Sequence, residues 1–191
     1  MDITKIFKSK ARMALLRLYF TNPDKEYYLR ELERILSTPV SVIRKELVAL
    51  EKSGIFKLSK KANLCYYSLN KAYPLYDELN NIIFKTVGIQ GALAALLLTI
   101  EGIEIAFIYG SYAKNESNTK SDVDLFIVGN IDEDSLLPEI NKLEEVLHRD
   151  INYSLYSRTD FIKKKNHKDS FIEDVIENKK IFLIGGENDI K

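Results

Sequence analysis

The sequence has little of what would place a protein outside the cell or in a membrane. Its one cysteine, Cys65, cannot form a disulfide within the chain, which excludes a disulfide framework and favours a reducing compartment. The longest apolar run, residues 92–98, is too short to span a bilayer. Residues 1–20 have no apolar core followed by small cleavage-site residues, so they predict no secretory signal. Together these absences predict a cytoplasmic protein without a membrane segment.

Histidine is also scarce, and several residues of catalytic types carry only weak signals. His148 and His167 lack the spacing of metal ligands, so we assign them surface or packing roles. The run of three lysines at 163–165 predicts a solvated helix face, with an approach to a triphosphate or nucleic acid as the alternative. No internal repeat or low-complexity segment is present.

Charge is balanced over the whole chain but not along it. There are 28 Lys/Arg and 28 Asp/Glu residues, so the formal net charge is zero. Residues 1–70 hold 14 Lys/Arg against 7 Asp/Glu, whereas residues 71–191 hold 14 against 21. This asymmetry predicts two modules with different partners. A basic module can contact phosphate backbones, and an acidic module can hold a metal cation.

Residues 1–70 predict a first domain of three helices followed by a hairpin. Apolar residues at helical and alternating spacing define these elements. The predicted elements are helices 9–21, 29–36 and 39–53 and strands 55–59 and 64–69. Thr38 is placed to cap the third helix, and Gly54 is placed to end it. A basic turn over 60–63 joins the two strands.

This order of elements resembles a winged helix-turn-helix domain. In the phrase LVALEKSGIFKLSKKANLCYYSLN, the helix end, the glycine and the wing follow one another as in that family. The resemblance implies that the third helix enters the major groove of DNA and that the wing tip meets phosphates. The residues it assigns to DNA are Ser41, Arg44 and Lys45 on the helix and Lys60, Lys61 and Asn63 on the wing. The alternative is a domain that binds protein or forms a homodimer, with ordinary surface lysines.

Residues 71–101 predict a helical connector, and residues 102–191 predict a second domain. In the connector, Gly88 interrupts the apolar pattern and separates two helices. Beyond it, apolar runs alternate with helical patterns. The predicted elements from 71 onward are helices 72–87, 89–101, 110–116, 134–148 and 159–177 and strands 103–109, 122–128, 150–156 and 181–184. The fold class of the whole chain is therefore α+β.

The most informative motif lies in residues 109–128, YGSYAKNESNTKSDVDLFIV. Gly110 and Ser111 follow one predicted strand, and Asp122 and Asp124 begin the next. Residues i and i+2 of a strand share a face, so the two carboxylates project side by side. Paired carboxylates suit a hard cation such as Mg²⁺ or Mn²⁺, and a Gly-Ser turn can offer N–H groups to a phosphate. The competing interpretation is an Asx-rich turn between two strands.

The Gly-Ser pair, its spacing and the Asp-x-Asp resemble the minimal nucleotidyltransferases of the polymerase-beta-like superfamily. The resemblance implies a palm-like mixed β-sheet with flanking helices. It implies that Asp122 and Asp124 are catalytic and hold Mg²⁺, while Gly110 and Ser111 bind the phosphates of an NTP, with ATP as first choice. The implied reaction is attack by a hydroxyl on the α-phosphorus with release of pyrophosphate. The acceptor could be a protein, as in toxin–antitoxin pairs, or a small molecule.

The same family places a third carboxylate on a later strand, and residues 150–156 offer two candidates. We take Asp150 as that catalytic residue, acting as general base on the acceptor or as ligand of a second metal. In the other alignment Asn152 occupies the position, and nucleotide binding could persist while transfer is crippled. Two hypotheses follow. One is a transferase fused to a DNA-binding winged helix, and the other is a transcription regulator whose transferase fold senses nucleotides or forms a dimer.

Overall fold

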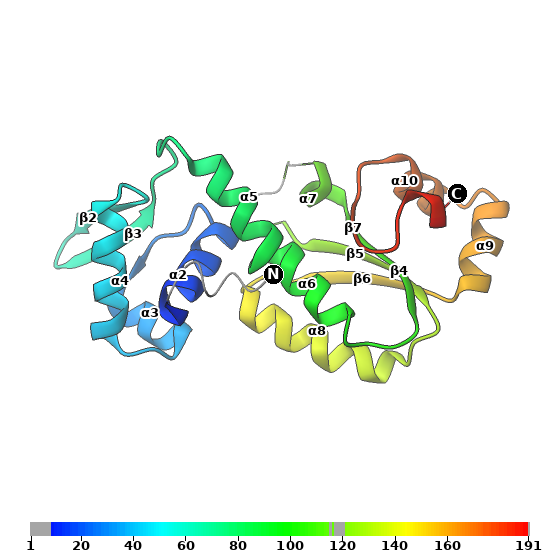
Figure 1. The fold of residues 1–191 in the computed structure, drawn as a ribbon, viewed down its shortest axis with the longest axis horizontal. Coiled ribbons are helices and arrows are strands. Elements are labelled where there is room, and N and C mark those ends of the chain that lie inside the picture. The colour runs from blue at the N-terminus through cyan, green and yellow to red at the C-terminus, as the bar shows by residue number, and fades with distance from the viewer. Residues whose placement is uncertain (1–8, 115, 117–120, 191) are drawn as a thin grey trace. The chain divides into compact units, whose positions relative to one another are not determined.

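The computed structural model describes residues 9–114, 116 and 121–190. The chain divides into two compact units, Met1–Ile89 and Gln90–Lys191, and each combines helices with a β-sheet (Figure 1). Among the described residues, no helix has the length and apolar character needed to cross a membrane. The α+β fold class is confirmed.

The N-terminal unit packs helices against a small antiparallel sheet. Its elements are helices α2 (Lys10–Thr21), α3 (Leu29–Leu36), α4 (Val40–Lys52) and α5 (Tyr76–Thr86) and strands β1 (Tyr27–Tyr28), β2 (Phe56–Lys61) and β3 (Leu64–Leu69). Strand β3 lies between β1 and β2, and β2 and β3 form a hairpin that extends from the unit (Figure 1). This arrangement confirms the predicted winged helix-turn-helix fold.

The core of this unit forms where the apolar faces of the helices meet the sheet. Leu47 of α4 and Tyr19 of α2 are fully buried in it. The Tyr19 hydroxyl donates to the carbonyl of Tyr67 in β3, at 3.1 Å, so its polar end is satisfied inside the core. The rings of Tyr27 and Phe56 meet the Tyr19 ring edge-on. These contacts join α2 to all three strands.

Gly54 ends α4 in a left-handed conformation, as the sequence predicted. Its φ is +83°, and a Cβ there would meet the Tyr73 ring at an ordinary contact distance of 3.6 Å. An alanine would therefore suffer conformational strain without a clash. We expect Gly54→Ala to lower the free energy of unfolding by about 1–2 kcal/mol, the cost of a left-handed non-glycine residue. A urea titration of the whole chain measures this change.

Gly186→Ala is the matched control for that titration. The backbone at Gly186 is extended, with φ −163°, and an added Cβ would have nothing within 4 Å. Its free energy of unfolding should stay close to that of the unmodified chain. Equal losses in the two variants would show that the conformation of Gly54 is not the cause.

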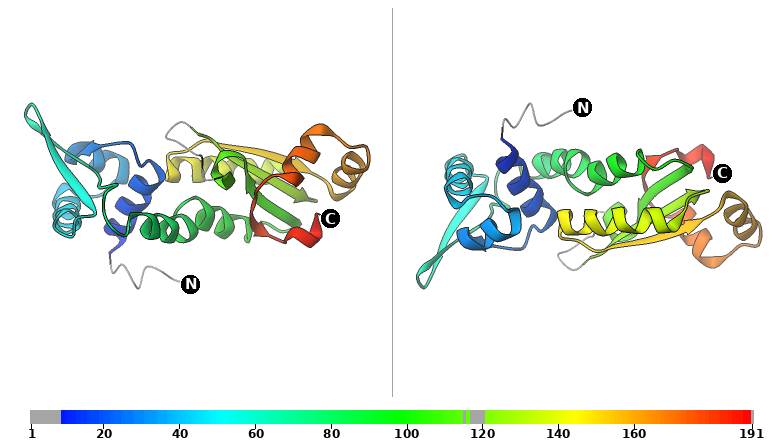
Figure 2. Two further views of the ribbon diagram at one scale, coloured as in Figure 1. Left: turned by 90° about the horizontal axis from the view of Figure 1, so that it is seen from above. Right: turned by 90° about the horizontal axis from the view of Figure 1, so that it is seen from below.

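The C-terminal unit is built on a mixed four-stranded sheet. Its strands are β4 (Ile103–Tyr109), β5 (Val123–Gly129), β6 (Ile151–Tyr156) and β7 (Ile181–Ile184). Its helices are α6 (Ile89–Leu97), α7 (Gly110–Lys114), α8 (Glu133–Leu147), α9 (Arg158–Asn166) and α10 (Ser170–Glu177), with a short 3₁₀ turn at Glu187–Asp189. The strand order is β6-β5-β4-β7, and Figure 2 shows the sheet from two sides. β5 runs antiparallel to β4 and parallel to β6, which confirms the mixed sheet.

Different helices cover the two faces of this sheet. On one face, Phe107 and Phe126 are fully buried in a cluster that includes Phe161 of α9 and residues of α10. On the other face, the Tyr153 hydroxyl donates to Glu133 of α8 at 2.9 Å. Because both faces are covered, residues 125–128 of β5 are completely buried. This burial fixes the position of β5, which Asp122 directly precedes and whose second residue is Asp124.

Two local predictions were wrong. Thr38 does not cap α4, because Pro39 takes the N-cap position and the Thr38 hydroxyl donates instead to the carbonyl of Leu36, at 2.9 Å. The single helix predicted over 159–177 is broken into α9 and α10. The break comes at Lys168, whose φ is +52°, and Asp169 then caps α10 by accepting two backbone N–H groups.

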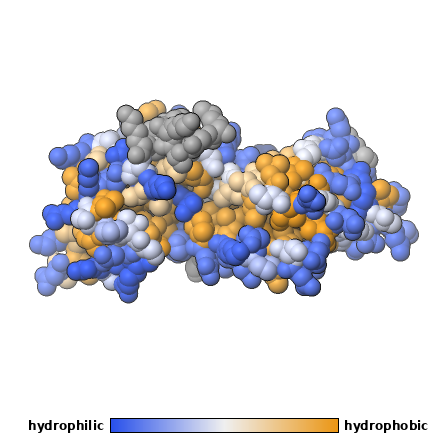
Figure 3. Space-filling model, turned by 60° about the horizontal axis from the view of Figure 1, so that its bottom comes forward, coloured by the Kyte–Doolittle hydropathy of each residue, from blue (hydrophilic) through white to orange (hydrophobic). Residues whose placement is uncertain are grey.

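Large apolar side chains also reach the surface in both units (Figure 3). Among the described residues, the most exposed of these are Leu98, at 74%, and Leu75, at 53%. Scattered exposed apolar residues are normal for folded domains and mark no site by themselves. The polar residues of the sheet carry the stronger signal for a site.

Candidate functional site

Three polar residues stand side by side where β5 begins. Asp124 is paired directly with Tyr109 of β4 and with Asn152 of β6. Directly paired residues point to the same face of a sheet. The side-chain amide of Asn152 donates to Oδ2 of Asp122, at 3.1 Å. Asn152 is thus in contact with one aspartate and is the strand neighbour of the other.

Gly110 lies directly against Asp124. Its φ is +67°, and a Cβ at this position would come within 2.2 Å of the Asp124 Oδ2 atom. A side chain at Gly110 would displace the carboxylate. The left-handed backbone and this close approach therefore both favour glycine at the position. Ser111 follows in α7 and is half-buried. The structure therefore brings the Gly-Ser pair and the Asp-x-Asp strand together.

The electrostatics of the paired aspartates favour a cation. Partial burial, and then the neighbouring Asp122 carboxylate, raise the pKa of Asp124 above its ordinary value. A divalent cation bound between them would counter both effects. Its positive charge would replace the solvation that burial removes, and it would offset the repulsion between the two carboxylates. Two carboxylate oxygens and the amide oxygen of Asn152 are all hard ligands of the kind that Mg²⁺ prefers. The residues present therefore fit one divalent cation.

Asp150 is the other candidate for the third carboxylate. It is exposed, it precedes β6, and its backbone carbonyl accepts the N–H of Val123 at 2.9 Å. Over the described part of the chain, no three His, Cys, Asp or Glu side chains are close enough together to hold a metal. The polar side chain beside Asp124 on β6 is instead Asn152.

Arg149 is a neighbour of the site that the sequence reasoning missed. It is only 7% exposed, and its guanidinium donates to the carbonyl of Ser121, at 3.3 Å, directly before Asp122. Burial raises the pKa of Tyr112, an effect that Arg149 opposes and Asp122 adds to. A buried arginine therefore contacts the backbone directly before the acidic pair. The only sequence signal was an arginine directly before the predicted strand 150–156.

The residues assigned to DNA lie on exposed parts of the N-terminal unit. On α4, Ser41, Arg44 and Lys45 are exposed and line a surface pocket of about 560 Å³. On the wing, Lys60 and Lys61 end β2, close to Asn63 in the turn. Lys61 forms an ion pair with Glu26 and lies 5.5 Å from the centre of the Tyr66 ring. Its charge is therefore partly compensated within the unit.

Residues 92–186 match the model of a protein family described as Polymerase beta, Nucleotidyltransferase. This part of the chain is a nucleotidyltransferase domain. The match begins in α6 and ends just after β7, so it includes the Gly-Ser pair, the Asp-x-Asp strand and β6. In the nucleotidyltransferase domain, Asp122, Asp124 and Asn152 meet at the start of the two parallel strands.

Solved structures also resemble parts of the chain, at low identity. Reduced HlyU from Vibrio cholerae N16961 is 21% identical and covers 44% of this chain and 83% of its own, with a TM-score of 0.35. A toxin–antitoxin structure with AMP-PNP is 16% identical and covers 53% of this chain and 77% of its own, with a TM-score of 0.41. A mutant of the toxin–antitoxin MntA-HpeT is 15% identical, with the same two coverages of 53% and 77% and a TM-score of 0.40. No curated protein sequence matches the chain.

Proposed function

We propose that this chain is a DNA-binding regulator whose nucleotidyltransferase domain binds a Mg²⁺–nucleotide but transfers it slowly or not at all. The observation that carries this proposal is the position of Asn152, paired with Asp124 and hydrogen-bonded to Asp122. An amide at this point has no negative charge and cannot accept a proton as a carboxylate does. Asn152 can therefore contribute to binding without acting as a general base.

In this proposal the acidic pair and the Gly-Ser pair form one nucleotide site. Asp122 and Asp124 hold the cation, and the N–H groups at Gly110 and Ser111 face the phosphates. Mg²⁺ supplies positive charge that offsets the charge of the triphosphate. The contact between Gly110 and Asp124 supports this division of roles, because it places the turn against the metal ligands. Arg149 fixes the backbone at Ser121 and so positions Asp122.

The N-terminal unit supplies the DNA contacts in the same proposal. Arg44 and Lys45 are exposed on α4, the helix that enters the major groove in winged helix domains. The side-chain ammonium of Lys60 at the wing tip forms no ion pair or hydrogen bond with the described residues, which leaves its charge for a phosphate. The basic composition of residues 1–70 adds a general attraction to DNA.

The DNA contacts predict a salt-dependent loss on substitution. We expect the double variant Arg44→Ala/Lys45→Ala to bind duplex DNA about tenfold or more weakly, because even one lost charge-assisted bond costs about 1.5–3 kcal/mol. The slope of log affinity against log salt should fall by roughly 2 if both residues contact phosphates. Fluorescence anisotropy with the duplex upstream of the chain's own coding sequence measures both quantities.

A second double variant separates position from net charge. Lys10→Ala/Lys25→Ala removes the same two charges from exposed sites of the same unit. It should bind DNA almost as well as the unmodified chain. If both doubles lose affinity equally, only net charge matters. If Arg44→Ala/Lys45→Ala loses none, α4 is not the DNA-binding face.

A further inference from the structure

An aromatic surface lies beside the acidic pair. Tyr109 is the last residue of β4 and the direct strand partner of Asp124, so the two side chains point to the same face of the sheet. The Tyr109 ring is partly exposed and meets the ring of Phe171, in the first turn of α10, with the centroids 6.0 Å apart. Phe171 is itself 37% exposed. Tyr109 and Phe171 therefore form one aromatic surface that begins next to Asp124.

Two tyrosines flank the Gly-Ser pair, and they differ in what they offer to a ligand. Tyr112 is only 8% exposed, and burial raises the pKa of its hydroxyl. This burial leaves no face of the Tyr112 ring for a ligand. Tyr109 keeps exposed ring area on the face of the sheet that carries Asp124. Tyr109 is thus the tyrosine of the two that can contact a bound molecule.

The Tyr109 hydroxyl is engaged within the sheet. Burial raises the pKa of Tyr109, a hydrogen bond with the Ser154 side chain of β6 opposes this effect, and the Asp124 carboxylate adds to it. The phenol is therefore neutral at pH 7, since the ordinary pKa of tyrosine is already about 10. Because the hydroxyl is neutral and bonded to Ser154, Tyr109 offers a ligand its ring face rather than its polar end.

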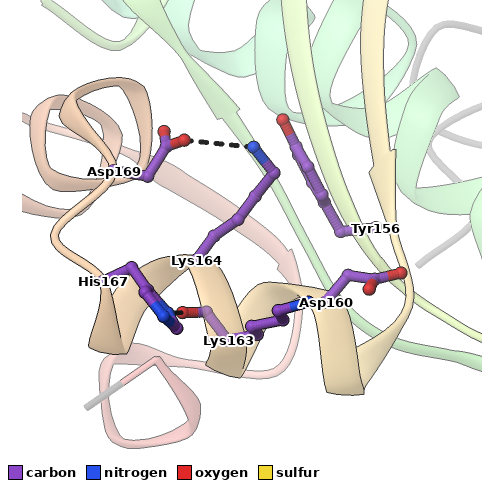
Figure 4. A pocket seen from close by; sticks show the side chains of 6 residues that line it. All are labelled: Tyr156, Asp160, Lys163, Lys164, His167 and Asp169. Carbon is purple, nitrogen blue, oxygen red and sulfur yellow. Dashed lines mark hydrogen bonds and ion pairs between the residues drawn. The ribbon is translucent and has the colours of Figure 1, made fainter.

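Phe171 is held in place by two contacts. The fully buried ring of Phe126 lies 6.2 Å from its own, centroid to centroid, and Asp169 accepts its backbone N–H, at 3.2 Å. Asp169 is bound in turn by Lys164, at 3.0 Å, across the turn between α9 and α10 (Figure 4). The lysine run at 163–165 was predicted to be a solvated face, whereas Lys164 makes this internal contact. Because Phe171 is already ordered, a ligand that packs on it loses little binding energy to ordering the side chain.

We propose that the nucleobase of the bound nucleotide stacks on this aromatic surface, an inference that rests on the nucleotide site proposed above. One ribose separates a base from its α-phosphate, and the surface begins at the strand partner of Asp124, which holds the cation in that proposal. Every base has a π face, so stacking alone discriminates little between bases. The Phe171 side chain has no polar atom and the Tyr109 hydroxyl is bonded to Ser154, which predicts similar affinities for ATP and GTP.

Calorimetry of the whole chain in Mg²⁺ tests this inference with ATP, GTP and inorganic tripolyphosphate, which has three phosphates and no base. The test variant is Phe171→Leu, which removes the ring but keeps an apolar side chain against Phe126. We expect it to weaken the binding of ATP and of GTP alike by about tenfold, within the range of one lost base–aromatic stack. Its affinity for tripolyphosphate should equal that of the unmodified chain.

Two control variants separate the ring from other effects. Phe171→Tyr keeps the ring and should keep the affinity for ATP. Ile162→Ala removes an apolar side chain of α9 that is 44% exposed, and it should change none of the three affinities. The inference is overturned if Phe171→Leu binds ATP as tightly as Phe171→Tyr does, or if it loses tripolyphosphate and ATP in the same proportion. If the unmodified chain binds neither tripolyphosphate nor ATP, the proposed nucleotide site is wrong, and the inference fails with it.

Discussion

Asn152→Asp is expected to raise nucleotide transfer by about 10²–10⁴-fold, the usual contribution of a positioned general base. The substitution places a carboxylate next to Asp124 and within reach of Asp122, where the side chain of Asn152 already makes its hydrogen bond. It also adds a third negative charge, which a second cation can use. Transfer is measured with Mg²⁺, α-phosphate-labelled NTPs and a lysate of the source cells as supply of acceptors.

Asp150→Asn is the control that separates the two possible positions of the third carboxylate. If Asn152 holds that position, Asp150→Asn should change transfer little, in the unmodified chain and in the Asn152→Asp variant alike. If the unmodified chain transfers label and Asp150→Asn abolishes it, Asp150 is the general base. That result would support the active transferase hypothesis and contradict the proposed function.

Asp124→Asn is expected to weaken Mg²⁺-dependent nucleotide binding by at least about 100-fold, since losing even an outer-shell partner of a metal costs 10–100-fold. In the proposed site, the variant removes one of the two carboxylates that would hold the cation. Gly110→Ala should act in the same direction, because its Cβ would come within 2.2 Å of the Asp124 Oδ2 atom. Calorimetry with a non-hydrolysable ATP analogue, with Mg²⁺ and with EDTA, measures the loss.

Asp134→Asn is the matched control for that experiment. It makes the same chemical change at an exposed position in the first turn of α8. Nucleotide affinity should then equal that of the unmodified chain. If Asp124→Asn binds the analogue as well as this control does, the acidic pair does not hold the metal, and the proposed site is wrong.

The sequence predicted most elements of the fold because their signals are local. Gly54 ends α4 because its conformation needs glycine, and the buried run at 125–128 reads as a strand covered on both faces. The approach of Gly110 to Asp124 followed from a recognised motif between two adjacent strands. Each of these inferences depends on few residues and short distances along the chain.

The choice between Asp150 and Asn152 could not be made from the sequence. The two residues are i and i+2 of one extended segment, so they share a face and alternation cannot separate them. The structure adds the register of β6 against β5, which pairs Asn152 with Asp124 and leaves Asp150 directly before the partner of Val123. That register depends on how the whole sheet packs against its covering helices, a property that no local pattern contains. The burial of Arg149 could not be predicted from the sequence for the same reason.

The most direct test of the central claim is one calorimetric titration of the unmodified chain with ATP and Mg²⁺, followed by recovery of the nucleotide. We predict saturable binding that EDTA abolishes, with the ATP recovered intact and no pyrophosphate released. Steady release of pyrophosphate would contradict the claim that Asn152 leaves the domain without its general base. Absence of binding would contradict the nucleotide site itself.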